Sequence, residues 1–260
     1  MASRRRQEWF DDELFWRELY SFMFTEERMA AADKNVKNVL QLAQPRGKMV
    51  LDLCCGPGRF SVALAKRRFR VTGVDKTRYL LDKAKARARK AGVKIEWIQK
   101  DMRDFVRPNA YDLILNMYTS FGYFNNKNED MQVLGNIYDC LRPGGAGVID
   151  TMGKERLAKI FLATASDTLP DGSLLVQKHK IIDDWTRIRN EWILIRKNRV
   201  KRFKFDISIY SGQELRDRME RVGFTDVKMY GNFDGTEYGP KAERLIIVGR
   251  KPGKRIRMRK

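Results

Sequence analysis

The stretch from Met49 to Phe60, MVLDLCCGPGRF, decides the fold of this chain. Its first residues, Met49 to Leu53, predict a short buried strand that runs into a tight glycine loop. Gly56 and Gly58 adopt positive φ without steric cost, so the backbone there can approach a ligand closely. In an open parallel sheet, ligands lie beyond the carboxyl ends of the strands. The stretch therefore predicts a nucleotide-like ligand over this loop.

Length and composition favour one globular domain in the cytoplasm. The 260 residues are 43% hydrophobic, which is enough for a sizeable core. The apolar runs stay shorter than the roughly 18–20 residues of a membrane span, and the basic start Met1 to Arg6 leads into no signal-peptide core. Three cysteines and the single His179 give neither a disulfide framework nor a zinc cluster. We therefore expect no metal, no membrane and a cytoplasmic location.

The net charge is strongly positive, because 53 Lys and Arg residues face 33 Asp and Glu residues, giving +20. The basic residues are spread over residues 76–90, 187–204 and a tail at 250–260. Two interpretations stay open: a surface that binds a polyanion, or the charge-rich solvated surface of a heat-adapted protein. Nucleic acid is therefore kept as an alternative partner.

Strands and helices alternate through the first half, which predicts βαβ units and a parallel sheet. The predicted strands are Met49–Leu53, Arg70–Val74, Val93–Gln99, Tyr111–Asn116 and Ala146–Asp150, and the predicted helices between them are Gly58–Arg68, Thr77–Ala91 and Glu129–Leu141. A helix capped by Ser211 and two final strands, Asp226–Tyr230 and Arg244–Gly249, complete the sheet with a late antiparallel hairpin.

Two further segments flank this unit. Residues Gln7 to Ala43 predict helices whose aromatic residues either pack on the domain or form a lid over the ligand. Three strand-like runs follow the fifth strand: Leu174–Ile182, Ile188–Arg196 and Val200–Tyr210. The predicted organisation is a helical lid at 1–45, an α/β domain at 46–152 and 211–250, an inserted antiparallel β roof at 153–210, and a basic flexible tail at 251–260.

Two cofactors suit the glycine loop. A dinucleotide requires a third glycine where Ser61 stands, and Asp75 at the end of the second strand can accept ribose hydroxyls from either cofactor. S-adenosylmethionine is favoured by Asp52, which can hold an ammonium group, and by Cys54, which is small enough for the methionine moiety to pass. The Asp101-Met102 pair after the third strand is suited to reading adenine, so the sequence favours S-adenosylmethionine.

Five motifs then resemble, in order and spacing, those of the class I S-adenosylmethionine-dependent methyltransferases: VLDLCCGPG, VTGVD, QKDMRDF, YDLILNMYTSFGYF and LRPGG. The resemblance covers Met49 to Asp150 and is nearest to the small-molecule members, the amino-sugar and glycine N-methyltransferases. It implies a Rossmann-like α/β fold with a seven-stranded, mostly parallel sheet and helices on both faces. The family has glycine where Cys54 stands. Asn116-Met117-Tyr118-Thr119 differs from the Asn-Pro-Pro-aromatic motif of nucleobase amino-methyltransferases, which disfavours that chemistry.

The candidate residues follow from the loop, the strand ends and the resemblance. The predicted cofactor-binding residues are Asp52, Cys54, Gly56, Gly58, Asp75, Lys76, Asp101, Met102 and Asn116, with Tyr20 from the lid. The predicted substrate-binding residues are Tyr118, Ser120, Tyr123, Trp185 and Tyr210, because aromatic faces near a sulfonium are favourable. His179 lies in an alternating strand between two lysines and is predicted to face solvent, so no catalytic residue is assigned.

The leading hypothesis is an enzyme that moves a methyl group from S-adenosylmethionine to an N or O atom of a small molecule, leaving S-adenosylhomocysteine. An RNA or protein methyltransferase that uses the basic surface is the alternative. A cofactor-binding regulator without catalytic activity is a third interpretation. The sequence leaves the oligomeric state open, a homodimer included.

Overall fold

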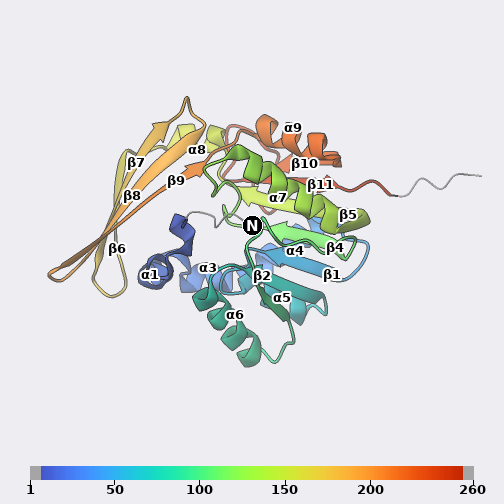
Figure 1. Cartoon of the computed structure of the whole chain (residues 1–260), viewed down its shortest axis with the longest axis horizontal. Coiled ribbons are helices and arrows are strands. Elements are labelled where there is room, and N and C mark those ends of the chain that lie inside the picture. Colours follow the sequence, from blue (N-terminus) through green and yellow to red (C-terminus); the bar gives the residue numbers. More distant parts are fainter. Residues whose placement is uncertain (1–6, 254–260) are drawn as a thin grey trace, which may run out of the picture.

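The computed structural model describes residues 7–253 of the chain, so the basic segments 1–6 and 254–260 lie outside the described residues (Figure 1). The N-terminal elements are η1 (Trp9–Asp11), α1 (Glu13–Glu18), α2 (Tyr20–Met23), α3 (Glu26–Ala30) and α4 (Ala32–Ala43). Next come β1 (Met49–Leu53), α5 (Arg59–Lys66), β2 (Arg70–Asp75), α6 (Arg78–Lys90), β3 (Glu96–Gln99), β4 (Tyr111–Asn116), α7 (Lys127–Cys140) and β5 (Leu141–Thr151). The last elements are α8 (Lys154–Ile160), β6 (Thr164–Thr168), β7 (Leu174–Ile182), β8 (Arg187–Arg196), β9 (Arg199–Ser208), α9 (Gly212–Val222), β10 (Thr225–Tyr230) and β11 (Leu245–Arg250).

The larger sheet has seven strands in the order β10-β11-β5-β4-β1-β2-β3. The strands from β5 to β3 run parallel to their neighbours, whereas β11 pairs antiparallel with both β5 and β10. Helices α7 and α9 pack together on one face, and α4 and α5 pack together on the other (Figure 1). The expected Rossmann-like sheet with a late antiparallel hairpin is therefore confirmed.

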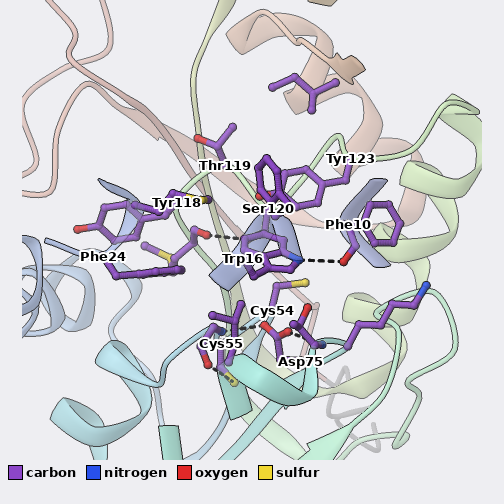
Figure 2. A pocket seen from close by; sticks show the side chains of 18 of the residues that line it. Phe10, Trp16, Phe24, Cys54, Cys55, Asp75, Tyr118, Thr119, Ser120 and Tyr123 are labelled. Atoms are coloured by element: carbon purple, nitrogen blue, oxygen red, sulfur yellow. Dashed lines mark hydrogen bonds between the residues drawn. The ribbon is translucent and has the colours of Figure 1, made fainter. Parts of the chain in front are cut away.

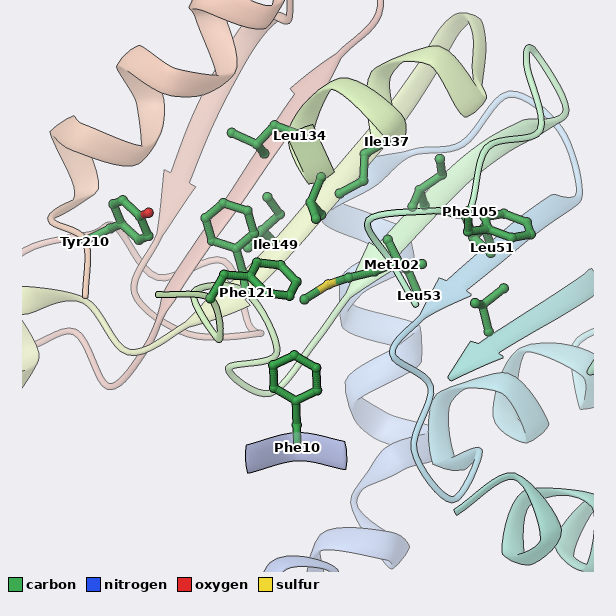
Figure 3. Close-up of a cluster of buried hydrophobic side chains, with 14 of the residues drawn as sticks. Phe10, Leu51, Leu53, Met102, Phe105, Phe121, Leu134, Ile137, Ile149 and Tyr210 are labelled. Atoms are coloured by element: carbon green, nitrogen blue, oxygen red, sulfur yellow. The ribbon is translucent and has the colours of Figure 1, made fainter. Parts of the chain in front are cut away.

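Strand β1 lies in the middle of this sheet and is buried on both faces. Val50 pairs with Val71 on one side and Leu113 on the other. Val50 belongs to the core beneath α4 and α5, and Leu51 and Leu53 belong to the opposite core, which joins the sheet to α7 and the N-terminal segment (Figure 3). Because helices cover both faces, the strand is apolar at nearly every position.

The carboxyl ends of β1, β2 and β4 meet at one edge of the sheet. Asp52 in β1 is opposite Gly73 in β2 and Leu115 in β4. This register places the glycine loop after β1 beside the ends of β2 and β4, where Asp75 and Asn116 close their strands. The edge is the position at which ligands bind in open parallel sheets.

The smaller sheet is antiparallel in the order β6-β7-β8-β9 and covers the N-terminal segment (Figure 1). In β8 and β9, Trp192 pairs with Phe203 and Asn190 pairs with Phe205, so these residues share one face. That face contacts the N-terminal segment through Phe15, whose ring is 5.4 Å from that of Phe203. The apolar face of β8 and β9 is therefore turned toward the N-terminal segment.

The N-terminal segment is helical but broken into short pieces. Asp12 accepts a hydrogen bond from the backbone of Leu14 at the start of α1, and Thr25 accepts one from Arg28 at the start of α3. Each break turns the chain. Aromatic residues at 9, 10, 15, 16 and 22 therefore reach the interior from several short elements, whereas a single helix would have presented one fixed stripe.

Some bounds differ from the sequence-based expectation. Strand β5 begins at Leu141 instead of Ala146, because Leu141 already pairs with Tyr111 ahead of an irregularity in the ladder. Strand β3 is limited to Glu96–Gln99. Strand β6, Thr164–Thr168, was not predicted, because it is an edge strand of mostly exposed residues without apolar alternation.

The helix start after the glycine loop provides a test of this packing. Gly58 has φ +73°, and a Cβ there would lie 2.8 Å from the Trp97 ring and 2.9 Å from Ala84 Cβ. Gly92 has φ +66°, but a Cβ there would meet nothing within 4 Å. We expect Gly92→Ala to lower the free energy of unfolding by about 1–2 kcal/mol for left-handed backbone, and Gly58→Ala by about 2–5 kcal/mol, since overpacking adds to that cost.

Urea denaturation of both variants measures the difference. Equal losses of stability would contradict the close packing of Gly58 against Trp97.

Candidate functional site

A cavity of about 440 Å³ lies at the carboxyl edge of the sheet, between the strand-end loops and a cover made by the N-terminal segment and strands β8 and β9 (Figure 2). Of the residues predicted from sequence, the cavity wall contains Asp52, Cys54, Gly56, Asp75, Lys76, Asp101, Met102, Tyr118, Ser120 and Tyr123. The glycine loop, the end of β2 and the loop after β4 therefore do come together around one space.

The loop after β1 combines close packing with left-handed backbone. Gly56 has φ +54°, and Cys54 has φ +61°, a conformation that favours glycine. The Cys54 Sγ atom lies 3.3 Å from Met102 Sδ, and burial raises the pKa of its thiol well above the usual range, so it stays protonated. Gly56 lines the cavity, whereas Gly58 faces Trp97 and Ala84 away from it. The prediction that Gly58 contacts the cofactor stays a prediction, and close packing against Trp97 and Ala84 already accounts for a glycine here.

Asp52 is a buried carboxyl at the end of β1. The Ser61 hydroxyl, from the first turns of α5, donates to its Oδ2 atom at 2.5 Å. Burial raises the pKa of Asp52 to about 6, and the hydrogen bond from Ser61 opposes that rise. A cationic group entering the cavity would stabilise the ionised form, so Asp52 is suited to holding an ammonium group.

Asp75 ends β2 and connects two loops. Its Oδ2 atom accepts from the backbone N–H of Gly56 at 2.8 Å, and its Oδ1 atom accepts from that of Thr77 at 2.9 Å. Burial raises its pKa despite these hydrogen bonds. Each carboxylate oxygen has a second lone-pair site, so a fixed Asp75 can still accept two hydroxyl donors from the cavity.

Asp101 is held in a charged cluster after β3. The Arg103 backbone and guanidinium donate to Oδ1 and Oδ2 at 2.7–3.0 Å, and Lys76 Nζ lies 3.2 Å from Oδ2. Although burial raises the pKa of Asp101, the hydrogen bonds from Arg103 lower it to about 2. Lys76 also pairs with Asp11, so its charge is shared between two carboxylates. Asp101 can therefore also accept a hydrogen bond from a ligand in the cavity.

Asn116 lies beneath the cavity wall and not on it. Its side chain is fully buried, and its amide donates to the backbone oxygen of Leu53 at 3.3 Å. Met102, whose Sδ atom lies 3.8 Å from the same amide, forms the wall. The end of β4 turns the Asn116 side chain into the sheet, and the contact of Asn116 with the cofactor stays a prediction.

Arg59 is a cavity residue that the sequence analysis missed. It is 8% exposed, its guanidinium lies 3.2 Å from the centre of the Tyr118 ring, and its Nη1 atom has no hydrogen-bond partner among the described residues. Burial lowers its pKa to about 10, so it remains charged at neutral pH. Its position as the first residue of α5, directly after the glycine loop, was the available signal. A buried cation that forms no ion pair within residues 7–253 suits a carboxylate ligand.

The loop after β4 is fixed in a strained conformation. Tyr118 and Thr119 both have positive φ, at 57° and 65°. Their backbone N–H groups donate to Asp150 at the end of β5, to Oδ2 and the carbonyl oxygen respectively, both at 2.9 Å. Asn35 from α4 donates to the Tyr118 hydroxyl at 2.9 Å. These bonds hold the ring of Tyr118 against Arg59.

Three predicted residues do not line the cavity. Tyr210 is buried and donates to Asp130 Oδ2 at 2.6 Å, behind the sheet edge. Trp185 is 44% exposed in the turn between β7 and β8. Tyr20 packs against Phe24 and Tyr79 on the outside of the N-terminal segment. Each prediction rested on residue type and approximate position, which do not determine the direction of a side chain.

Aromatic residues of the cover line the cavity instead of these three residues. Trp9, Phe15 and Phe22 from the N-terminal segment and Trp192 and Phe205 from β8 and β9 line the cavity. The inward face of each strand follows from its period-two pattern, so Trp192 and Phe205 were accessible to sequence reasoning once the strands were placed.

Comparisons with known proteins agree with this geometry. Residues 50–145 match the methyltransferase domain family. YqeM of Bacillus subtilis (strain 168), itself named only provisionally as a methyltransferase, is 24% identical over 218 residues, which are 82% of this chain and 87% of that protein. The next two relatives are matched over 51% and 42% of their own lengths.

Two solved structures share the fold. An S-adenosylmethionine-dependent methyltransferase from Clostridium acetobutylicum ATCC 824 superimposes with a TM-score of 0.74 at 15% identity, covering 93% of this chain and 99% of that one. The sugar N-methyltransferase KedS8 from Streptoalloteichus sp. ATCC 53650 gives 0.68 at 19% identity, covering 97% and 99%.

The fold matches that of solved Rossmann-like methyltransferases. Residues 50–145 carry a methyltransferase domain, and together with the homologues this domain supports an enzyme of the S-adenosylmethionine-dependent methyltransferase type. Within residues 7–253, no helix is long and apolar enough to cross a membrane, and no three His, Cys, Asp or Glu side chains cluster as metal ligands would.

The charged cluster beside the cavity provides a second test. Arg103 is 1% exposed and pairs with Asp101 and Glu129, whereas Arg107 forms a similar bidentate pair with Glu96 at the surface. We expect Arg103→Met to lower the free energy of unfolding by about 3–5 kcal/mol, because it removes the buried guanidinium that pairs with Asp101 and Glu129 and leaves only Lys76 beside Asp101. Arg107→Met is expected to cost less than about 1 kcal/mol.

Chemical denaturation at pH 7 compares the two variants. A loss for Arg103→Met no larger than that for Arg107→Met would contradict a structural role for the buried cluster.

Proposed function

We propose that this chain transfers the methyl group of S-adenosylmethionine to a small molecule held under the aromatic cover. The observation that carries the proposal is one cavity in which Asp52, Asp75 and Arg59 line the sheet edge and aromatic side chains line the cover. The known sugar N-methyltransferase with the same fold supports a small acceptor.

The residues at the sheet edge fit the cofactor. The unpartnered Arg59 Nη1 atom suits its carboxylate, and the buried Asp52 suits its ammonium group. Asp75, fixed by two backbone N–H groups, suits the ribose hydroxyls. Asp101 and Met102 are on the wall where adenine would lie. When bound, S-adenosylmethionine supplies a methyl group made electrophilic by its sulfonium.

The chain contributes positioning and exclusion of water. The aromatic cover and Met102 leave the centre of the cavity apolar, while Ser120 and Tyr123 bring hydroxyls to its wall. Burial raises the pKa of Tyr123, so its hydroxyl stays protonated and is unsuited to act as a base. The only histidine of the chain, His179, lies on β7, and its ring nitrogen contacts the backbone oxygen of Leu162. We therefore assign no catalytic base, and favour an acceptor atom that is unprotonated at the working pH.

A macromolecular acceptor receives less support. The basic side chains on the cavity wall are Arg28, Arg59 and Lys76, and apart from Arg28 and Asn190 the side chains that the N-terminal segment, β8 and β9 bring to the wall are apolar or aromatic. On the outer face of the cover, Arg189 pairs with Asp206, and Glu191 pairs with Arg202 and Lys204, so part of the positive charge is neutralised locally. The cavity therefore favours a small molecule over RNA or protein.

Calorimetry with S-adenosylhomocysteine tests the proposed cofactor site. We expect the wild-type chain to bind it and Asp75→Ala to bind about 10- to 100-fold more weakly, because charge-assisted hydrogen bonds to the ribose are lost. Asp82→Ala serves as the control, since Asp82 is 57% exposed on α6. Circular dichroism checks that each variant is folded. No binding by the wild-type chain, or equal binding by Asp75→Ala, would refute the proposal.

The pH dependence of binding tests Asp52 separately. Its pKa is raised to about 6 in the free protein, and an ammonium group beside it lowers that pKa, so binding releases a proton below pH 6. The dissociation constant of S-adenosylhomocysteine is therefore expected to fall about tenfold from pH 5 to pH 7 and then level off.

Asp52→Asn should flatten most of this pH profile. Asp130→Asn is the matched control, because burial also raises the pKa of Asp130 to about 6 but its carboxyl bonds Tyr210 outside the cavity wall. A profile unchanged by Asp52→Asn would show that Asp52 does not contact the ammonium group.

A further inference from the structure

We propose that the acceptor is a planar aromatic or conjugated molecule, uncharged where it meets the cover, that carries hydrogen-bond-accepting oxygen. This inference rests on the proposed function, because it assigns the cover side of the cavity to the acceptor. Its basis is an aromatic wall that contains two buried indole N–H groups without a hydrogen-bond partner within residues 7–253.

The wall is built from rings of different elements. Trp9 stacks on Phe205 with ring centres 4.7 Å apart, and it lies 4.7 Å from Tyr123 at a tilted angle. Trp192 lies 5.2 Å from Phe205 and 5.6 Å from Phe22, in both cases edge to face. Such rings offer flat, rigid, apolar surface to a ligand and prefer offset or edge contacts with another ring.

The indole N–H groups of Trp9 and Trp192 add a hydrogen-bonding requirement to this apolar wall. The Nε1 atoms of Trp9 and Trp192 are buried and have no hydrogen-bond acceptor among the described residues. By contrast, Trp16 Nε1 donates to the backbone oxygen of Phe10 at 2.9 Å. An indole N–H is a donor only, and leaving one buried and unpaired is unfavourable. Two oxygen atoms of the acceptor, one beside each indole, would satisfy both N–H groups.

The same wall disfavours a cationic acceptor group. The carboxylates on the cavity wall within residues 7–253 are Asp52, Asp75 and Asp101, all at strand ends on the sheet side. On the cover, the amide of Asn190 already donates to the backbone of Ile188 and Phe205. An ammonium could rest on the aromatic faces, but it has no lone pair for the indole N–H groups and would leave both unpaired.

Nuclear magnetic resonance of the indole N–H groups tests this proposal directly. The chain has five tryptophans, so the full-length protein labelled with ¹⁵N-tryptophan gives at most five indole signals. The protein is first saturated with S-adenosylhomocysteine, whose binding is established by calorimetry. Coumarin and 2-naphthol serve as neutral planar probes with oxygen acceptors, and glucosamine serves as the cationic polyhydroxylated probe.

We expect coumarin or 2-naphthol to move the signals of Trp9 and Trp192 and to leave those of Trp16 and the exposed Trp185 in place. Trp9→Phe and Trp192→Phe assign the signals. Each keeps an aromatic ring but removes one N–H, so each should weaken probe binding about 2- to 10-fold. Trp185→Phe should leave it unchanged.

The outcomes separate the two proposals. If S-adenosylhomocysteine binds but neither planar probe moves Trp9 and Trp192, the acceptor inference is wrong and the proposed function stands. The inference is also wrong if glucosamine binds there more tightly than the planar probes, or if both phenylalanine variants bind the probes as well as the wild type. Absence of S-adenosylhomocysteine binding would overturn the proposed function and this inference with it.

Discussion

The carboxylate of Asp75 accepts hydrogen bonds from the backbone of two different loops, at Gly56 and at Thr77. The first bond ties the glycine loop after β1 to the end of β2, and the second fixes the turn into α6. Because the carboxylate is buried, replacing these donors by water is unfavourable, and the loops are held in one arrangement. The positions of Asp52, Cys54 and Arg59 around the cavity all depend on this arrangement, since they lie within or beside the same loop.

A second buried carboxylate performs the same task three strands away in the sheet. Asp150, at the end of β5, accepts from the backbone N–H of Tyr118 at 2.9 Å and pairs with Arg244 from beside β11. It thereby offsets the cost of two consecutive left-handed residues, Tyr118 and Thr119. The loop so fixed continues to Gly122, whose carbonyl oxygen accepts from Ser208 N at 2.7 Å at the end of β9. Strain at the sheet edge is therefore linked by backbone bonds to the position of the cover.

The sequence predicted the sheet and its edge well, because both depend on local signals. Apolar runs that end in glycine or aspartate define β1 and β2, and Asp52, Asp75 and Asp101 reach the cavity wall because a strand end leaves little freedom of direction. The cover was harder to predict. Tyr210 and Trp185 lie close in sequence to wall residues, but one turns to Asp130 and the other to solvent. Their directions depend on tertiary contacts, to which residue type gives no guide. Arg59 was missed because the signal for it is a buried guanidinium nitrogen without a hydrogen-bond partner within residues 7–253, which only the structure shows.

The N-terminal segment contributes both to the buried core and to the wall of the cavity. Its residues Phe10, Phe15 and Trp16 belong to the large buried core and also line the cavity. Two of its ion pairs, from Glu18 to Arg196 and Lys201, lie on a partly exposed rim where ion pairs contribute little. The aromatic core therefore holds the segment in place, and its rings form the wall only while they remain packed. Trp9 differs from these neighbours, because it is only partly buried and its N–H is unpaired. Within this segment, Phe10, Phe15 and Trp16 stabilise the fold, whereas Trp9 is the residue we propose to contact a ligand. These residues are close in sequence, but they differ in burial and in hydrogen bonding.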